Sequence, residues 1–212
     1  MINHNKQFIF IHIPKCGGTS VETALLNTYN NGEQLLKRKA NYKGRFEFNF
    51  LTRNEQIDMF GATLNKSPQH WKLRMYKPVI QQSYYTFTFV RNPWDLVVSE
   101  YRYFKKMKPK LAKNMSFEQF VIRNPRTMKF HLDEQHTFIN EHIDYIGRME
   151  TLNEDFKNIC DELYLENLQL PQVNVTNKHK IHYTEYYSNK SREIIQERYK
   201  KDIDIFEYSF GE

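Results

Sequence analysis

The sequence predicts an α/β protein with a central, mostly parallel sheet flanked by helices. Two apolar runs at residues 8–13 and 84–90 are rich in β-branched and aromatic side chains, which is the composition of buried strands. Each run is followed directly by a segment with the apolar spacing of a helix. A third, shorter pair of this kind begins at residue 143. Repeated strand-then-helix order is typical of a parallel sheet.

Composition favours a single globular domain over residues 1–212. The chain is 40% hydrophobic and 15% aromatic, which is enough for a sizeable core. It has no run of 18 apolar residues for a membrane span, and its first residues lack the features of a signal peptide. Cys16 and Cys160 give neither a disulfide framework nor metal-ligand spacing. We therefore expect a cytoplasmic protein without a bound metal.

The first strand is expected to end at Pro14 and to turn into a helix over residues 21–26. Between them lie Lys15, Cys16, Gly17, Gly18, Thr19 and Ser20. A glycine turn into a helix gathers free backbone N–H groups at the positive end of the helix dipole, and such a place binds anions. Our hypothesis is that this loop holds the 5′ phosphate of a nucleotide. The alternative is a tight turn that binds nothing.

The second strand is followed by Arg91 and by a clear helix start. Asn92 is expected to cap the helix, with Pro93 at its first position. An apolar stripe predicts the core face of this helix, formed by Trp94, Val97, Val98, Tyr101 and Phe104. Ser99 lies off that stripe, so its hydroxyl can face a ligand or solvent.

Arg91 and Ser99 suggest a second anion site. Ligands of open α/β sheets bind at the carboxyl ends of the strands, where both Arg91 and the glycine loop are expected to lie. The guanidinium fork can bond two phosphate oxygens at once. Two anion sites on one edge indicate a nucleotide with phosphates at both ends. In the alternative interpretation Arg91 is a salt-bridged residue and Ser99 a surface hydroxyl.

The remaining chain predicts shorter elements and a basic surface. We expect a strand at 46–50, a short helix at 70–75, a helix from a Ser116/Gln119 capping box to about 124, a strand at 143–147, a helix from a Thr151/Glu154 capping box and a final helix over 188–200. The net charge of +6 and the pI near 9.1 favour an anionic partner.

Two segments carry a resemblance to a known family. They are Ile11-His12-Ile13-Pro14-Lys15-Cys16-Gly17-Gly18-Thr19-Ser20 and Phe89-Val90-Arg91-Asn92-Pro93-Trp94-Asp95-Leu96-Val97-Val98-Ser99-Glu100-Tyr101. Together they resemble the sulfotransferase family, most closely its carbohydrate-type branch related to heparan sulfate 2-O-sulfotransferase. Residues 146–156 and 199–208 resemble later blocks of that branch. The resemblance implies a P-loop-like, three-layer fold and transfer of a sulfuryl group from 3′-phosphoadenosine 5′-phosphosulfate, which leaves adenosine 3′,5′-bisphosphate as product.

The resemblance also implies roles for individual residues. By motif position, Gly17, Gly18, Thr19 and Ser20 bind the 5′ phosphosulfate together with Lys15, and Arg91 with Ser99 binds the 3′ phosphate. Lys15 also stabilises the charge that grows on the leaving oxygen. The acceptor is expected to be a carbohydrate or small molecule.

A histidine is the natural base for the acceptor, and His70 is our prediction because this branch tends to carry one before the Arg91 strand. His131 with Gln135 is the next candidate for acceptor contact. His12, within the first strand, is expected to be a core residue. Arg148 is expected either to contact nucleotide or to pair with a carboxylate such as Glu150.

Two other function classes remain open from the sequence. A P-loop nucleotide kinase is disfavoured because Lys15 precedes the glycines, whereas a Walker A lysine follows them. In addition, no apolar strand ends in the aspartate that holds magnesium in such enzymes. A non-catalytic nucleotide or nucleic-acid binder could use the basic surface, but nucleic acid is unlikely because no nucleic-acid motif is present.

Overall fold

A computed structural model describes residues 1–3, 6–25, 70–76, 78–123, 131–166, 168–171 and 181–212. The expected strand at 46–50 lies outside these residues. The sheet has four strands in the order β1 (Ile2–Asn3), β2 (Phe8–Ile11), β3 (Tyr85–Val90) and β4 (Tyr145–Arg148). β2, β3 and β4 are parallel, and the short β1 pairs antiparallel with β2. The predicted α/β fold with a mostly parallel sheet is therefore confirmed.

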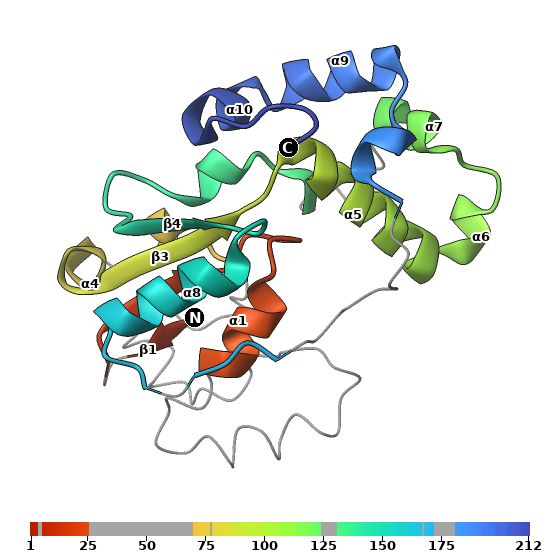
Figure 1. Ribbon diagram of the computed structural model, residues 1–212. Helices are drawn as coiled ribbons and strands as arrows, with labels where there is room; N and C mark the ends of the chain where they lie inside the picture. Colours follow the sequence, from red (N-terminus) through yellow and green to blue (C-terminus); the bar gives the residue numbers. More distant parts are fainter. Residues whose placement is uncertain (4–5, 26–69, 77, 124–130, 167, 172–180) are drawn as a thin grey trace.

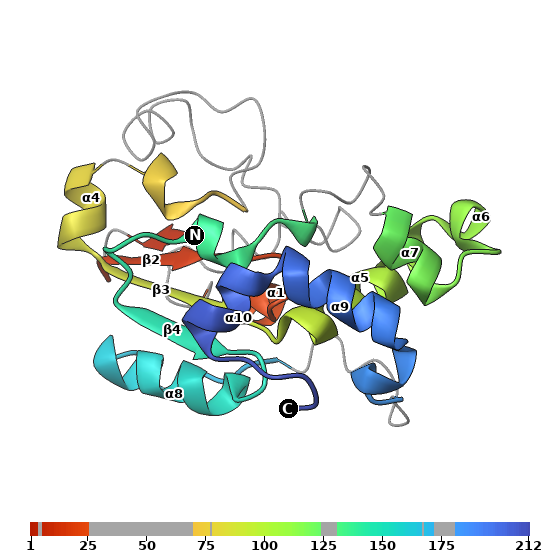
Figure 2. The same cartoon turned by 90° about the horizontal axis from the view of Figure 1, so that it is seen from above.

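Helical segments lie on both sides of the sheet. Figure 2 shows α8 (Leu152–Glu162) along one side, and α4 (Pro78–Ser83) with the 3₁₀ turn η2 (Leu73–Met75) on the other. The predicted short helix at 70–75 is thus only that 3₁₀ turn. In the core, aromatic rings of β2 and β3 pack on one another, as in the stacked pair of Phe10 and Phe87. Their burial holds the middle of the sheet together.

A second group of helices extends from the carboxyl end of β3. There α5 (Pro93–Met107) leads to α6 (Pro109–Ala112) and α7 (Phe117–Arg123), as Figure 1 shows. The C-terminal part contains the 3₁₀ turn η5 (Tyr183–Tyr186), α9 (Asn189–Arg198) and α10 (Lys200–Phe206), and α9 packs against both α5 and α7. No helix in the described ranges is long and apolar enough to cross a membrane.

The helix starts show which local predictions hold. The Asn92 side chain accepts from the Trp94 N–H at 3.1 Å, and Ser116 and Gln119 form the predicted reciprocal capping box. The capping box at Thr151 is wrong: its hydroxyl donates instead to the Asp155 carboxylate at 2.6 Å. The same carboxylate oxygen of Asp155 also accepts a hydrogen bond from the Arg148 N–H. This second bond joins β4 to the start of α8.

Candidate active site

The glycine loop (residues 15–20) connects β2 to α1 (Gly18–Leu25). Neighbouring side chains lie so close to Gly17 and Gly18 that a larger residue would not fit at either position. Gly17 has a φ of +77°, in the left-handed region that favours glycine. A Cβ on Gly17 would lie 2.8 Å from the Met149 sulfur, and one on Gly18 would overlap the His12 ring. Lys15 also has a positive φ, of +67°, although it is not a glycine. The loop is therefore a tightly bent, closely packed backbone.

The bend presents the start of α1 to the carboxyl edge of the sheet. The N–H groups of Ser20 and Val21 bond the Gly17 carbonyl, at 3.0 and 3.3 Å. The first two amides of α1, those of Gly18 and Thr19, have no acceptor within the helix, and they lie at the positive end of its dipole. Thr19 and Ser20 are both partly exposed in this turn. The loop has the backbone features of the predicted phosphate site.

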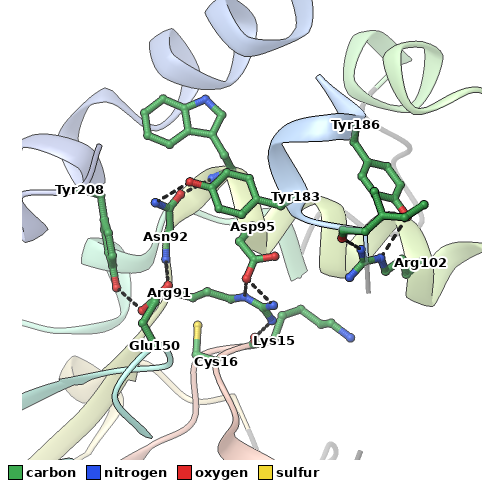
Figure 3. A network of polar contacts seen from close by, with 12 residues as sticks. Lys15, Cys16, Arg91, Asn92, Asp95, Arg102, Glu150, Tyr183, Tyr186 and Tyr208 are labelled. Carbon is green, nitrogen blue, oxygen red and sulfur yellow. Dashed lines mark hydrogen bonds and ion pairs between the residues drawn. The ribbon is translucent and has the colours of Figure 1, made fainter. Parts of the chain in front are cut away.

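Arg91 lies directly against this loop. Its Nη1 donates to the Lys15 carbonyl at 2.9 Å, while Nε and Nη2 donate to one carboxylate oxygen of Asp95 at 2.9 and 2.6 Å. Figure 3 shows the guanidinium between Asp95 and Lys15. Arg91 therefore forms the salt bridge that the alternative interpretation expected, with Asp95 as its partner. The expected meeting of Arg91 with the glycine loop is also observed.

Beside Arg91 lies a pocket of about 210 Å³, lined by Arg91, Asp95, Arg102, Glu150, Ile181, His182, Tyr183 and Glu212. Ser99 is partly exposed on the same helix, one turn beyond Asp95. Sequence reasoning missed Arg102, which bonds the Ile181 carbonyl at 2.9 Å and the Tyr186 hydroxyl at 3.3 Å. Arg102 could have been found from its position three residues after Ser99, because residues three apart are neighbours on the surface of a helix.

The C-terminal tail fixes the turn that carries Arg91. Glu150 accepts from the Asn92 N–H at 2.8 Å and from the Tyr208 hydroxyl at 3.0 Å (Figure 3). Arg148 donates to the Phe206 carbonyl at 2.6 Å and stacks on Tyr208. The expected pairing of Arg148 with Glu150 is thus wrong, because Glu150 is used by the backbone and the tail.

Gln135, at the start of the 3₁₀ turn η4 (Gln135–Phe138), holds the same turn from the other side. It is fully buried, and its amide exchanges two 2.8 Å hydrogen bonds with the Arg91 backbone. The Cys16 thiol also donates to Gln135, at 3.3 Å. The expected acceptor contact of Gln135 is therefore wrong. Cys16 is buried, and burial raises the pKa of its thiol far above the usual range, which disfavours the reactive thiolate.

The Lys15 side chain points away from Arg91 toward a second cluster. Its Nζ lies 4.4 Å from the centre of the Tyr103 ring. Burial lowers the pKa of Lys15, and the Glu100 carboxylate opposes that shift. The Lys15 ammonium thus extends from the glycine loop to the face of the Tyr103 ring.

Three histidines form this second cluster with Tyr103. The ring centres of His12 and His70 are 4.5 Å apart, those of His70 and His131 are 6.0 Å apart, and those of His131 and Tyr103 are 5.7 Å apart. His12 is buried, and its Nδ1 pairs with the buried Glu22 carboxylate at 3.0 Å. The expectation that His12 is a satisfied core residue is confirmed.

The His70 ring is oriented by a hydrogen bond to a backbone carbonyl. Its Nδ1 lies 2.9 Å from the His12 carbonyl, which can only accept, so in the neutral ring Nδ1 carries the proton and Nε2 the lone pair. Burial lowers the pKa of His70 to about 4, and neighbouring His12 acts in the same direction. A neutral His70 can accept a hydrogen bond from a hydroxyl, but it holds a transferred proton weakly.

His131 is oriented by a buried carboxylate. Its Nδ1 lies 3.1 and 3.2 Å from the two oxygens of Glu100, which is fully buried on α5. The apolar stripe of α5 predicted only its hydrophobic core residues, so Glu100 was overlooked. Among the described residues, no three His, Cys, Asp or Glu side chains gather in a way that could hold a metal ion.

Comparison with known proteins gives one match over most of the chain. Residues 1–209 match a family model described as the sulfotransferase family. An uncharacterized protein of Archaeoglobus fulgidus is 32% identical over 85 residues, which are 39% of this chain and 69% of that protein. No solved structure gives a significant match.

Proposed function

Because the chain belongs to the sulfotransferase family, we propose that it transfers a sulfuryl group from 3′-phosphoadenosine 5′-phosphosulfate to an acceptor. The acceptor is a hydroxyl or amine of a carbohydrate or small metabolite. We further propose that residues 1–212 act as one domain in the cytoplasm. Both cysteines are free and buried, as expected in a reducing compartment.

One observation supports the donor site most strongly: the hydrogen bond from Arg91 to the Lys15 carbonyl. It joins the two segments that the sequence assigned to opposite ends of one nucleotide. Gly17, Gly18, Thr19 and Ser20 fit the 5′ end, because they form the bend into the start of α1, where backbone N–H groups and the helix dipole favour an anion. Arg91 and Ser99 fit the 3′ phosphate, which then competes with Asp95 for the guanidinium.

The donor, when bound, supplies the sulfuryl group. Lys15 then provides positive charge beside the glycine loop, where negative charge develops on the leaving oxygen. His70 is the proposed base, whose Nε2 accepts the proton of the attacking hydroxyl. The rings of Tyr103 and of three histidines, His12, His70 and His131, pack together on this side.

A thermal-shift experiment separates this proposal from the two alternatives. Adenosine 3′,5′-bisphosphate, ATP with magnesium, and single-stranded nucleic acid are compared. We expect the bisphosphate alone to stabilise the protein strongly, by about 2.7 kcal/mol at 100 times its Kd. Stabilisation by ATP with magnesium but not by the bisphosphate would favour a kinase. Stabilisation by nucleic acid alone would favour the binding protein.

A further inference from the structure

We propose that the Tyr103 ring positions the Lys15 side chain for the reaction by holding its ammonium over the aromatic face. This inference rests on the proposed sulfotransferase function, in which Lys15 acts on the leaving oxygen. It adds Tyr103 to that function as a positioning residue, which acts on the donor only through Lys15.

The Lys15 backbone is fixed, and with it the direction in which the side chain leaves the loop. Its φ of +67° lies in the left-handed region, which residues other than glycine adopt uncommonly. Its carbonyl accepts a hydrogen bond from Arg91 Nη1 at 2.9 Å. Figure 3 shows the Lys15 side chain leading away from the Arg91 guanidinium. The backbone does not by itself set the position of the ammonium, because a lysine carries it on a flexible four-carbon chain.

The ring of Tyr103 supplies the contact at the end of that chain. Lys15 Nζ lies 4.4 Å from the ring centre, within the distance of about 6 Å at which an aromatic face attracts a cation. Among the residues that the structure describes, the Lys15 ammonium makes neither a hydrogen bond nor an ion pair. Tyr103 is itself held on α5, with its ring 5.7 Å from that of His131. The aromatic face is therefore the contact that fixes the ammonium.

An aromatic face suits this task better than a directly bonded carboxylate. Burial lowers the pKa of Lys15, and the nearby cations Arg91 and Lys106 act in the same direction, whereas Glu100 and Cys16 oppose the shift. The face of Tyr103 attracts the ammonium without neutralising it, and the N–H groups stay able to donate. Lys15 thus keeps a full positive charge for the leaving oxygen.

The first test is independent of activity. An aromatic ring moves the NMR signals of protons above its face upfield. We therefore expect the ε-methylene signals of Lys15, identified as those lost in Lys15→Arg, to lie upfield of ordinary lysine signals in the ligand-free protein. Tyr103→Phe should keep this shift, and Tyr103→Leu should abolish it. An ordinary ε-methylene shift in the parent would overturn the proposal.

The second test measures free sulfate released from labelled donor, with water as the acceptor. We expect Tyr103→Leu to lower kcat roughly 3- to 30-fold, because the attraction between the cation and the ring is lost. Tyr103→Phe should recover the rate to within about threefold of the parent, because phenylalanine keeps the aromatic face. The Kd of adenosine 3′,5′-bisphosphate should stay within about twofold in both variants. Tyr164→Leu, at a residue that is 86% exposed after α8, is the control and should keep the parent rate.

A series of fluorinated rings separates attraction from packing. Tyr103 is replaced by phenylalanine that carries one, two or three ring fluorines. Fluorine withdraws negative charge from the face of the ring and changes its shape little. The rate should therefore fall stepwise with each added fluorine, with a smaller change in the KM of the donor. Equal rates across the series would show that the ring acts only by packing, and would overturn the proposal.

The outcomes separate the two proposals. If the parent neither binds the bisphosphate nor releases sulfate, the sulfotransferase proposal fails, and the role of Tyr103 in the reaction fails with it. If the parent does both, and Tyr103→Leu keeps its rate, only the role of Tyr103 is wrong.

Discussion

The two sides of Lys15 are built in different ways. On the donor side, Arg91 and its neighbours come from continuous motifs and are tied to the backbone and the C-terminal tail by charged hydrogen bonds. On the acceptor side, single residues from four distant segments meet as a cluster of rings over buried carboxylates. The proposed donor side is thus held by hydrogen bonds to charged groups, whereas the proposed acceptor side is a packed group of imidazole and phenol rings.

The largest expected effect concerns the residue shared by both sides. Lys15→Ala should lower sulfuryl transfer by at least 10²-fold, because one electrostatic donor at a transition state contributes about 2.7–4 kcal/mol. Binding of adenosine 3′,5′-bisphosphate, measured by calorimetry, should largely persist. The exposed Lys110→Ala on α6 is the control. Near-normal turnover of Lys15→Ala would remove this residue from the reaction.

The next effect is confined to the donor side. Arg91→Ala should reduce the preference for adenosine 3′,5′-bisphosphate over adenosine 5′-phosphate roughly 10- to 100-fold, since hydrogen bonds to charged groups contribute about 1.5–3 kcal/mol. Competition binding measures the ratio, with the exposed Arg74→Ala as a control. A variant that discriminates as well as the parent would refute the 3′-phosphate assignment.

The acceptor side predicts a dependence of stability on pH. The pKa of His70 is lowered from 6.5 to about 4 in the folded protein, so between these values the unfolded chain binds more protons. Acidification therefore destabilises the fold. We expect His70→Gln to reduce the loss of unfolding free energy between pH 7 and pH 5 by about 1–2 kcal/mol. Chemical denaturation at both pH values tests this, and an identical loss in parent and variant would contradict it.

The smallest effect is expected at Ser99. Replacing its hydroxyl in Ser99→Ala removes one hydrogen bond to the proposed 3′ phosphate, with a net value of about 0.5–1.5 kcal/mol. Bisphosphate affinity should therefore fall roughly 2- to 10-fold. Ser83→Ala on α4 is a matched control, since its hydroxyl bonds the Val79 carbonyl of its own helix. An unchanged Kd for Ser99→Ala would show that Ser99 lies outside the donor site.

Local sequence patterns predicted the strands and the helix start that carry the proposed donor site. The strand, the glycine turn and the Asn92 cap depend on residues close together in the chain, so β2, β3 and the start of α5 appear where expected. The uses of Arg148 and Gln135 were missed because their partners, Phe206 and the Arg91 backbone, are set by tertiary packing. Glu100 shows the same limit, since its partner His131 lies 31 residues further along the chain and is brought to it by tertiary packing.

The most direct test of the donor site is NMR of the nitrogen-15-labelled protein with adenosine 3′,5′-bisphosphate. One ligand should shift the backbone amides of Gly17, Gly18, Thr19 and Ser20 and also the Nε–H of Arg91, which now bonds Asp95. Adenosine 5′-phosphate should shift only the loop amides. If the bisphosphate moves the loop but leaves Arg91 unchanged, or moves neither, the two segments do not form one nucleotide site.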